Sequence, residues 1–435
     1  MSEVKINYSK HKNLILFSII LSTFFLFVYH FSEIGFFAYA GLAFMLLPVL
    51  FVDLSECMCL ILFYLPNIRM YAFIDGNTML GFFVLFAFVK FFFLRFNKIS
   101  IKIFLAVIFM GAVVIINAFL NQDFSLFMSF IRFSAGLIII LMYFNLVNNE
   151  YDFDFDYEKL MKYFIYGCFS LITCGILFES LKGHSVFNQR FSGINNDPNF
   201  FAMVVGAAFS IQLVNIAFSK KASNGSLFIA LYILFGGMLS LSRSFLISIS
   251  INIILLLYIF FVNRSLSMNR KILIILLIPI FLFIFRGAIS NIYESFVDRF
   301  NEGNLEGANG RAEINEMYLK LWRQNAASIW FGIGSYEHIV SQNLFFDAHH
   351  NYYVEILTTI GIFGVLAMIN IYRLLYKNII IKIQKLNILL LFPLLTYAIM
   401  IMTLPALFDD THLFMIMLMM MQYRRFQDHQ RGVLT

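Results

Sequence analysis

Three arginines and one histidine stand where their side chains could act together on an anion. Arg190, Arg243 and Arg311 lie in or beside polar stretches that separate apolar runs, and His350 lies near the end of the longest of these stretches. Guanidinium groups bind phosphates through paired hydrogen bonds. A histidine can deprotonate a hydroxyl or bind a phosphate, depending on its charge. If these side chains converge, they predict a pocket for an anionic lipid headgroup, especially a diphosphate, whose developing charge as a leaving group they could stabilise without a metal ion.

The segment from Arg190 to Asn199 runs directly into an apolar span. Asp197 precedes Pro198, as at a helix start where a carboxylate caps the first turn and proline takes the first helical position. Capping alone can explain Asp197. Arg190 needs another explanation, because it is the one arginine of this short loop. A helix N-terminus beside a guanidinium is a ready anion site, so Asp197 and Asn199 are expected to support it.

Arg243 lies where one apolar span meets the next. A guanidinium at the centre of a membrane helix costs about 2.5–3.5 kcal/mol, and snorkelling to the interface lowers that cost. Snorkelling predicts apolar neighbours, yet Ser240, Ser242 and Ser244 surround Arg243, which favours a binding role. Arg132 lies inside another span, and for it internal pairing is the favoured interpretation, with a functional role as the alternative.

The longest polar interval runs from about Ser290 to Asn351 between two apolar spans. A transporter has no need of so long a segment, whereas chemistry on a membrane-anchored substrate does. Trp322 and Trp330 suit anchors at the level of the lipid headgroups. Asn351 fits a helix cap. A lone histidine is more often structural than catalytic. Here two histidines, His349 and His350, stand together at the start of a span, which favours a functional role for His350.

Composition places these residues in a polytopic membrane protein of the all-α class. The chain is 61% hydrophobic and 13% charged, with a mean hydropathy of +0.82, whereas soluble domains carry about 25% charged residues. A membrane helix needs about 20 apolar residues, which predicts 12–14 spans. The candidate spans begin near Leu14, Gly35, Ser55, Thr78, Ile101, Leu126, Leu160, Pro198, Ser226, Ser244, Lys271, Tyr352, Leu386 and Thr411. The span from Ser55 to Pro66 is short enough to be re-entrant, and the last, from Thr411 to Met421, is also short.

Lysine and arginine concentrate in one set of alternate loops, which predicts that this set is cytoplasmic. An even number of spans then places both termini in the cytoplasm and the interval 290–351 in the periplasm, as a large loop within a single integral membrane domain, 1–435. The net charge of +6 does not indicate a nucleic-acid partner, because the cations lie in short loops rather than on one face. A last acidic cluster, Asp409-Asp410-Thr-His412, is expected to cap the final span, with cation binding as the alternative.

The order of these motifs resembles the O-antigen ligase and polymerase superfamily. Over roughly Phe164 to Ala367, the chain has the superfamily's alternation of motifs and membrane spans, with the long loop late in the sequence. The motifs that carry the resemblance are the segment Arg190–Asn199, Ser242-Arg243, Gly310-Arg311, Gly332-Ile-Gly334 and His350-Asn351.

The resemblance implies a bacterial inner-membrane glycosyltransferase with its active site on the periplasmic side and no metal or other cofactor. Its substrates would be undecaprenyl-diphosphate-linked glycans, with membrane lipid and a chain-length regulator protein as further partners. Arg190, Arg243 and Arg311 would hold the diphosphate, Arg311 and His350 would be catalytic, and Asn351 would support them.

The superfamily contains repeat-unit polymerases as well as ligases that move glycan onto lipid A-core. Arg323 and Gly334, with ten residues between them, resemble a pattern of the polymerases, so Arg323 is a further supporting candidate and polymerisation of O-antigen or capsule repeat units is the leading hypothesis. The ligase activity is the alternative. A flippase for the same lipid-linked units is the alternative from another class. The number of spans and Arg132 fit it, but its loops would be short on both sides.

Overall fold

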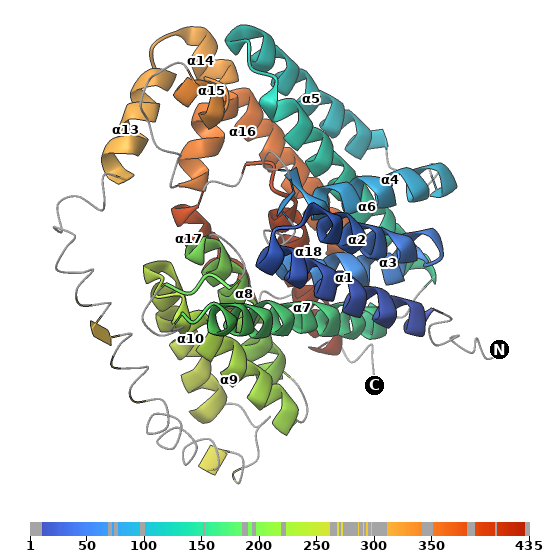
Figure 1. Ribbon diagram of the computed structural model, residues 1–435. Helices are drawn as coiled ribbons and strands as arrows, with labels where there is room; N and C mark the ends of the chain where they lie inside the picture. Colours follow the sequence, from blue (N-terminus) through green and yellow to red (C-terminus); the bar gives the residue numbers. More distant parts are fainter. Residues whose placement is uncertain are drawn as a thin grey trace.

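The structure is a computed structural model, and its described residues form an all-α bundle with one two-stranded hairpin (Figure 1). The described ranges are 11–67, 72–73, 77–95, 101–150, 153–184, 190–193, 197–218, 223–261, 311–341, 351–380, 388–404 and 407–430, with isolated positions between 262 and 310. At Arg243 and Arg311 the description covers the main chain and leaves out the side chain. His350 lies outside the described residues.

Long helices make up the body of the bundle. They are α1 (Lys12–Ser32), α2 (Gly35–Leu46), α3 (Leu54–Tyr64), α4 (Met79–Arg95), α5 (Ile101–Asn121), α6 (Ser125–Glu150), α7 (Phe153–Leu181), α8 (Pro198–Phe218), α9 (Asn224–Leu239), α10 (Arg243–Phe261), α13 (Arg311–Trp322), α16 (Tyr352–Ile379), α17 (Phe392–Met400) and α18 (Asp410–Gln430). Shorter elements are α14 (Ala326–Phe331), α15 (Tyr336–Ser341), the 3-10 turns η1 (Leu47–Leu50), η2 (Leu65–Asn67), η4 (Ile388–Leu391) and η5 (Ile401–Thr403), and the antiparallel pair β1 (Ala72–Phe73) and β2 (Asn77–Thr78).

Six helices of the described chain are long and apolar enough to cross a membrane, namely α1, α5, α6, α7, α8 and α16, and four shorter apolar helices accompany them. The expectation of an all-α, polytopic membrane protein is therefore confirmed. Most expected helix starts agree within about two residues with those of the described helices, because apolar runs bounded by polar residues determine them. Helix α7 instead begins at Phe153, well before the expected Leu160, and α17 begins at Phe392, after the expected Leu386. The number of 12–14 spans stays a prediction, since much of 262–310 lies outside the described residues.

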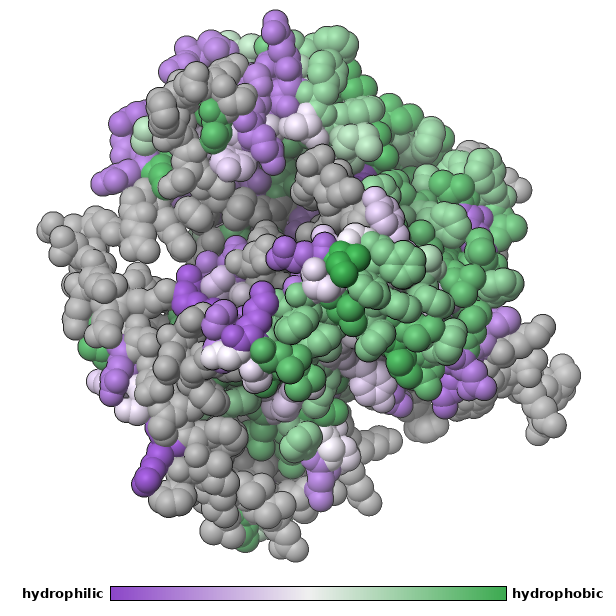
Figure 2. Space-filling model, viewed as in Figure 1, coloured by the Kyte–Doolittle hydropathy of each residue, from purple (hydrophilic) through white to green (hydrophobic). Residues whose placement is uncertain are grey.

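Helix α8 lies at the centre of the bundle and α1 at its edge. Within their apolar segments, 94% of α8 is buried inside the protein but only 22% of α1. Helices α7, α9, α10, α17 and α18 pack around α8. Apolar side chains cover the face formed by the N-terminal helices, whereas polar ones gather over α13 to α15 (Figure 2). The apolar face suits contact with lipid.

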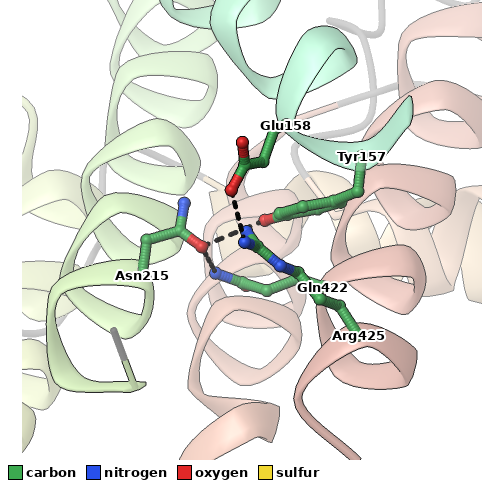
Figure 3. A network of polar contacts seen from close by, with 5 residues as sticks. All are labelled: Tyr157, Glu158, Asn215, Gln422 and Arg425. Atoms are coloured by element: carbon green, nitrogen blue, oxygen red, sulfur yellow. Dashed lines mark hydrogen bonds and ion pairs between the residues drawn. The ribbon is translucent and has the colours of Figure 1, made fainter. Parts of the chain in front are cut away.

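Helix α18 is longer than the sequence predicts. The expected span ended at Met421, but the helix continues to Gln430. Polar side chains beyond the apolar run bond to neighbouring helices, as Figure 3 shows. Gln422 donates to the carbonyl of Ile211 (2.7 Å) and to Oδ1 of Asn215 (3.2 Å), and Arg425 forms an ion pair with Glu158 (2.6 Å). These partners on α7 and α8 sustain the helix past the point where hydropathy falls.

Helix α16 is interrupted one third of the way along. Gly361 has φ 65° and ψ −173° there, so the main chain leaves the helical conformation for one residue and then resumes it. A break of this kind releases carbonyl groups that would otherwise accept hydrogen bonds within the helix. In an apolar environment such groups need other donors.

Candidate functional site

The loop that carries Arg190 is held against three helices. The amide of Phe191 donates to the carbonyl of Leu239 at the end of α9 (3.1 Å). The Phe191 ring is buried and packs edge-on against Phe201 of α8, with 5.1 Å between centroids. Gly193 has φ 65° and lies against Gly175 of α7, where a Cβ would come within 2.5 Å of the Gly193 Cα. The main chain on the C-terminal side of Arg190 is therefore fixed by packing.

Arg190 and Ser242 meet on the side chain of Asn199. The Arg190 Nη2 donates to Asn199 Oδ1 (2.9 Å), and the Ser242 hydroxyl donates to the same oxygen (3.2 Å). Asn199 lies in the first turn of α8, which Asp197 caps by accepting the Asn199 amide proton on Oδ1 (2.7 Å). Capping by Asp197 is confirmed. Two segments more than 40 residues apart in sequence thus share one amide oxygen.

The turn that precedes Arg243 is stabilised by its own serines. The Ser240 hydroxyl donates to the Gly237 carbonyl (2.6 Å) and accepts from the Ser242 amide (3.2 Å). The hydroxyl oxygens of Ser242 and Ser244 are 2.7 Å apart. All three serines are buried, and hydrogen bonds of their hydroxyls run to one another, to the Gly237 carbonyl, to the Ser242 amide and to Asn199. The turn starts α10 at Arg243, one residue after the hydroxyl that bonds Asn199.

The structure therefore brings the main chain of Arg243 beside the Arg190–Asn199 contact. Whether the Arg243 and Arg311 guanidinium groups and His350 join them stays a prediction, since those groups lie outside the described residues. Arg311 is the first residue of α13, which packs against α14 and α16. Arg323 is exposed just after α13.

Asn351 caps α16, as expected. Its Oδ1 accepts the amides of Tyr353 (3.0 Å) and Val354 (3.4 Å). The Tyr353 hydroxyl donates to the carbonyl of Ala398 in α17 (3.2 Å), and α17 packs against both α8 and α10. Helix α17 thus connects the start of α16, where His350 precedes Asn351 in sequence, with the two helices that carry the Arg190 contact.

The remaining polar candidates have structural partners. Arg132 donates to Ser129 of its own helix (3.1 Å), in keeping with internal pairing. Asp409 caps α18 by accepting the Thr411 amide (2.7 Å), also as expected. His412 is buried and bonds the Tyr397 hydroxyl. Over the part of the chain that the structure describes, no group of three or more His, Cys, Asp or Glu side chains is arranged to hold a metal ion.

A set of residues that the sequence did not single out lies at the end of α5. Asn117, Asn121 and Asp123 bond to the main chain of residues 331–335 and of α16. The signal for this set was present in the sequence, because Asn117 and Asn121 are four residues apart and therefore share a face of their helix. Polar amides on one face of an otherwise apolar span need partners inside the protein.

The geometry defines a multi-pass, all-α membrane protein with an arginine-bearing loop seated at the start of its central helix. Residues 228–369, about a third of the chain, match the family model described as O-antigen ligase. This region is similar to the O-antigen ligase domain of a family that includes polymerases and ligases and acts on undecaprenyl-diphosphate-linked glycans. No curated protein matches the chain. The matched region contains Arg243, Arg311 and His350, while Arg190 lies before it.

Proposed function

We propose that this protein is a glycosyltransferase that polymerises undecaprenyl-diphosphate-linked repeat units of O-antigen or capsule. The reaction takes place at the periplasmic face of the bacterial inner membrane, with both termini in the cytoplasm. The observation that supports this proposal most directly is the contact of Arg190 and Ser242 on Asn199. It holds the Arg190 guanidinium at the start of the central helix, and Arg243 is the residue that follows Ser242 in the sequence.

In the proposed reaction, Arg190, Arg243 and Arg311 bind the diphosphate of the growing chain. A hydroxyl of the incoming lipid-linked unit attacks the anomeric carbon, the bond from that carbon to the diphosphate oxygen breaks, and undecaprenyl diphosphate leaves. His350 takes the proton of the attacking hydroxyl. The guanidinium groups stabilise the charge that develops on the leaving diphosphate, which is where fixed positive groups contribute most to the rate.

A ligase that moves the finished glycan onto lipid A-core is the second candidate, because the matched family model is described as O-antigen ligase. The two activities share a donor and differ in the acceptor. The spacing of Arg323 and Gly334, which resembles a pattern of polymerases, favours polymerisation. The rest of the candidate site is common to both.

The test replaces Arg190 by Ala in the host and compares the surface glycan on a gel. A polymerase is expected to lose its ladder and leave a band of one repeat unit. A ligase would lose surface glycan while lipid-linked polymer accumulates. The matched control is Lys320→Ala, which removes an exposed cation of α13 paired with Glu316 (3.0 Å) and is expected to leave the ladder intact.

A ladder of normal length in the Arg190→Ala strain would contradict both assignments. The transporter alternative has a separate test with the wild-type protein in vesicles that contain the lipid-linked repeat unit. Movement of the unit across the bilayer with no glycosidic bond formed would indicate a flippase.

A further inference from the structure

Asn117 bonds two carbonyls that belong to distant parts of the chain. Its side chain is fully buried, and its Nδ2 donates to the carbonyls of Phe331 (2.6 Å) and Thr359 (2.8 Å). Thr359 lies two residues before Gly361, at which α16 is interrupted. Asn117 thus supplies a donor for the carbonyl that the break would leave without one. A buried unbonded carbonyl is costly, so this amide helps to sustain the break.

Asn121 and Asp123 extend the same contact along residues 332–335. Asn121 Nδ2 donates to the Gly332 carbonyl (3.3 Å), and Asp123 Oδ2 accepts the Ser335 amide (2.8 Å). The hydroxyls of Ser125 and Ser335 are 2.8 Å apart. We call Asn117, Asn121 and Asp123 the dock. It receives the segment 331–335, which begins at the last residue of α14 and leads into α15.

The docked segment also fits into the break of α16 through close main-chain contact. The Ile333 amide donates to the Thr358 carbonyl (2.8 Å). A Cβ on Gly332 would lie 2.1 Å from the Thr359 oxygen, and one on Gly361 would lie 2.5 Å from the Trp330 carbonyl. Both glycines have positive φ, which other residues adopt only with strain. The two backbones therefore approach each other at positions where only glycine fits.

We propose that the dock is a positioning site for the glycosyl transfer. It fixes residues 331–335 of the polar interval and the first part of α16 together, and these two segments flank, in the sequence, the stretch that contains His350. Because α14 and α16 both pack against α5, the dock relates this stretch to the rest of the bundle. Its residues precede the matched region 228–369, so an earlier part of the chain supplies the support. This inference rests on the proposed function.

The proposal predicts a particular kinetic effect. Arg190 and Ser242 lie beside the starts of α8 and α10, whereas the dock lies at the end of α5 and bonds to residues 331–335 and to α16. Of the proposed diphosphate ligands, Arg311 alone begins an element, α13, that packs against α14 and α16. Loss of the dock should therefore leave donor binding by Arg190 and Arg243 intact while displacing the groups near the start of α16. A displacement of about 1 Å can cost about 100-fold in rate. Asn117→Ala is thus expected to lower kcat by about 10- to 100-fold with little change in KM for the lipid-linked repeat unit.

The geometry itself can be tested without any activity. In the double variant Ser125→Cys, Ser335→Cys, the two thiols would replace hydroxyls 2.8 Å apart, close enough for a disulfide after a small rotation. A disulfide is expected to form readily in the full-length protein in membranes, and each single variant serves as the control. Failure of the pair to cross-link would overturn the dock.

The positioning role is tested with lipid-linked repeat units from host cells that lack this protein. In Asn117→Ala combined with the cysteine pair, oxidation should restore the lost rate and reduction should remove it again. The control is Asn67→Ala, which deletes another fully buried amide, bonded to the Gly167 carbonyl (3.2 Å), and should keep the wild-type kcat per folded molecule.

Normal kcat in Asn117→Ala, or a lost rate that the disulfide does not restore, would overturn the positioning role. If the wild-type protein forms no glycosidic bond, the proposed function fails, and the positioning role fails with it. The cross-link still reports on the dock in that case. The two failures are therefore distinguishable.

Discussion

The dock and the network in Figure 3 both join distant segments through side-chain amides, but they hold different kinds of backbone. In the network, Gln422 of α18 bonds to Asn215 of α8, and both residues belong to continuous helices. In the dock, Asn117 bonds to Thr359 beside a break and to Phe331 at the end of α14, and Asn121 bonds to Gly332 in the non-helical main chain that follows. The network includes an ion pair, Arg425 with Glu158, whereas the dock's bonds run mainly to main-chain groups.

Polar groups therefore have two roles in this protein. In the network they stabilise the packing of regular helices, and in the dock they maintain an irregular main-chain conformation. A hydrogen bond between continuous helices contributes about 0.6 kcal/mol on average in a membrane protein, and its loss leaves the helices intact. A donor to a released carbonyl maintains an irregular conformation that no helix would adopt alone. The network should therefore matter for stability and the dock for activity.

The largest effect is expected from Gly332→Ala. The new methyl group would lie 2.1 Å from the Thr359 oxygen, and φ at this position is 91°. A non-glycine residue at such a φ costs about 1–3 kcal/mol before the close contact is counted. The docked segment should be displaced and activity reduced about 100-fold. When Gly332→Ala is added to the double variant Ser125→Cys, Ser335→Cys, the disulfide should no longer form. Gly225→Ala, whose Cβ would meet nothing closer than 3.7 Å, is the matched control.

Gln422→Leu is expected to have a smaller effect, on stability and not on activity. This change keeps the side chain's size but removes its bonds to Ile211 and Asn215. The free energy of unfolding should fall by about 1 kcal/mol, measured as a lower unfolding temperature in detergent. Activity per folded molecule should stay at the wild-type value. A large loss of specific activity at unchanged stability would remove the distinction between the two regions.

The contribution of the Asp123 carboxylate of the dock to stability should depend on pH. Burial raises the pKa of the Asp123 carboxyl, but hydrogen bonds from Ser335 and Ser125 outweigh burial and leave this pKa below its usual value. A lowered pKa in the folded state means that the carboxylate's contribution is complete above the unfolded pKa, about 3.9, and is lost as the pH falls through the folded value.

The stability difference between wild type and Asp123→Asn should therefore be constant at neutral pH and shrink below about pH 4. Unfolding temperatures of the two proteins across that range provide the measurement. A difference that changes between pH 6 and 8 would mean that another group controls the dock.

The smallest effect is expected from Glu158→Gln in the network. The Glu158 side chain is half-exposed, although its oxygen is 2.6 Å from Arg425. Ion pairs of this kind contribute about 0–1 kcal/mol and weaken with salt. The unfolding temperature should fall slightly at low ionic strength and match the wild type in high salt. A salt-independent loss would show that the pair is shielded from solvent.

Much of the helical framework could be predicted from the sequence. Hydropathy and loop composition located the helix starts, and cap chemistry identified Asp197, Asn351 and Asp409, because all these signals are local. The length of α18 was predicted wrongly because partners on other helices, and not hydropathy, sustain its polar end. Trp330 shows a mixed result, since it is 45% exposed as a headgroup anchor would be and yet stacks on Phe363 at 5.0 Å.

The candidate site was predicted in part. Arg190 and Ser242 share the Asn199 side-chain oxygen. The expected convergence of the three guanidinium groups and His350 stays a prediction, because the Arg243 and Arg311 side chains and His350 lie outside the described residues. The dock could not be predicted, because Asn117 bonds to residues more than 200 positions away. Spacing on one helix face shows that a polar partner is needed, but it does not say which segment provides it.

The bond from Asn117 to Thr359 also limits how this chain can be recombined with a related one. In a chimera with α16 from one parent and α5 from another, the Thr359 carbonyl beside the break of α16 would lie against a side chain with which it did not evolve. The two helices, although separated by more than half of the sequence, form one unit of exchange. Crossovers placed by sequence proximity alone would divide that unit.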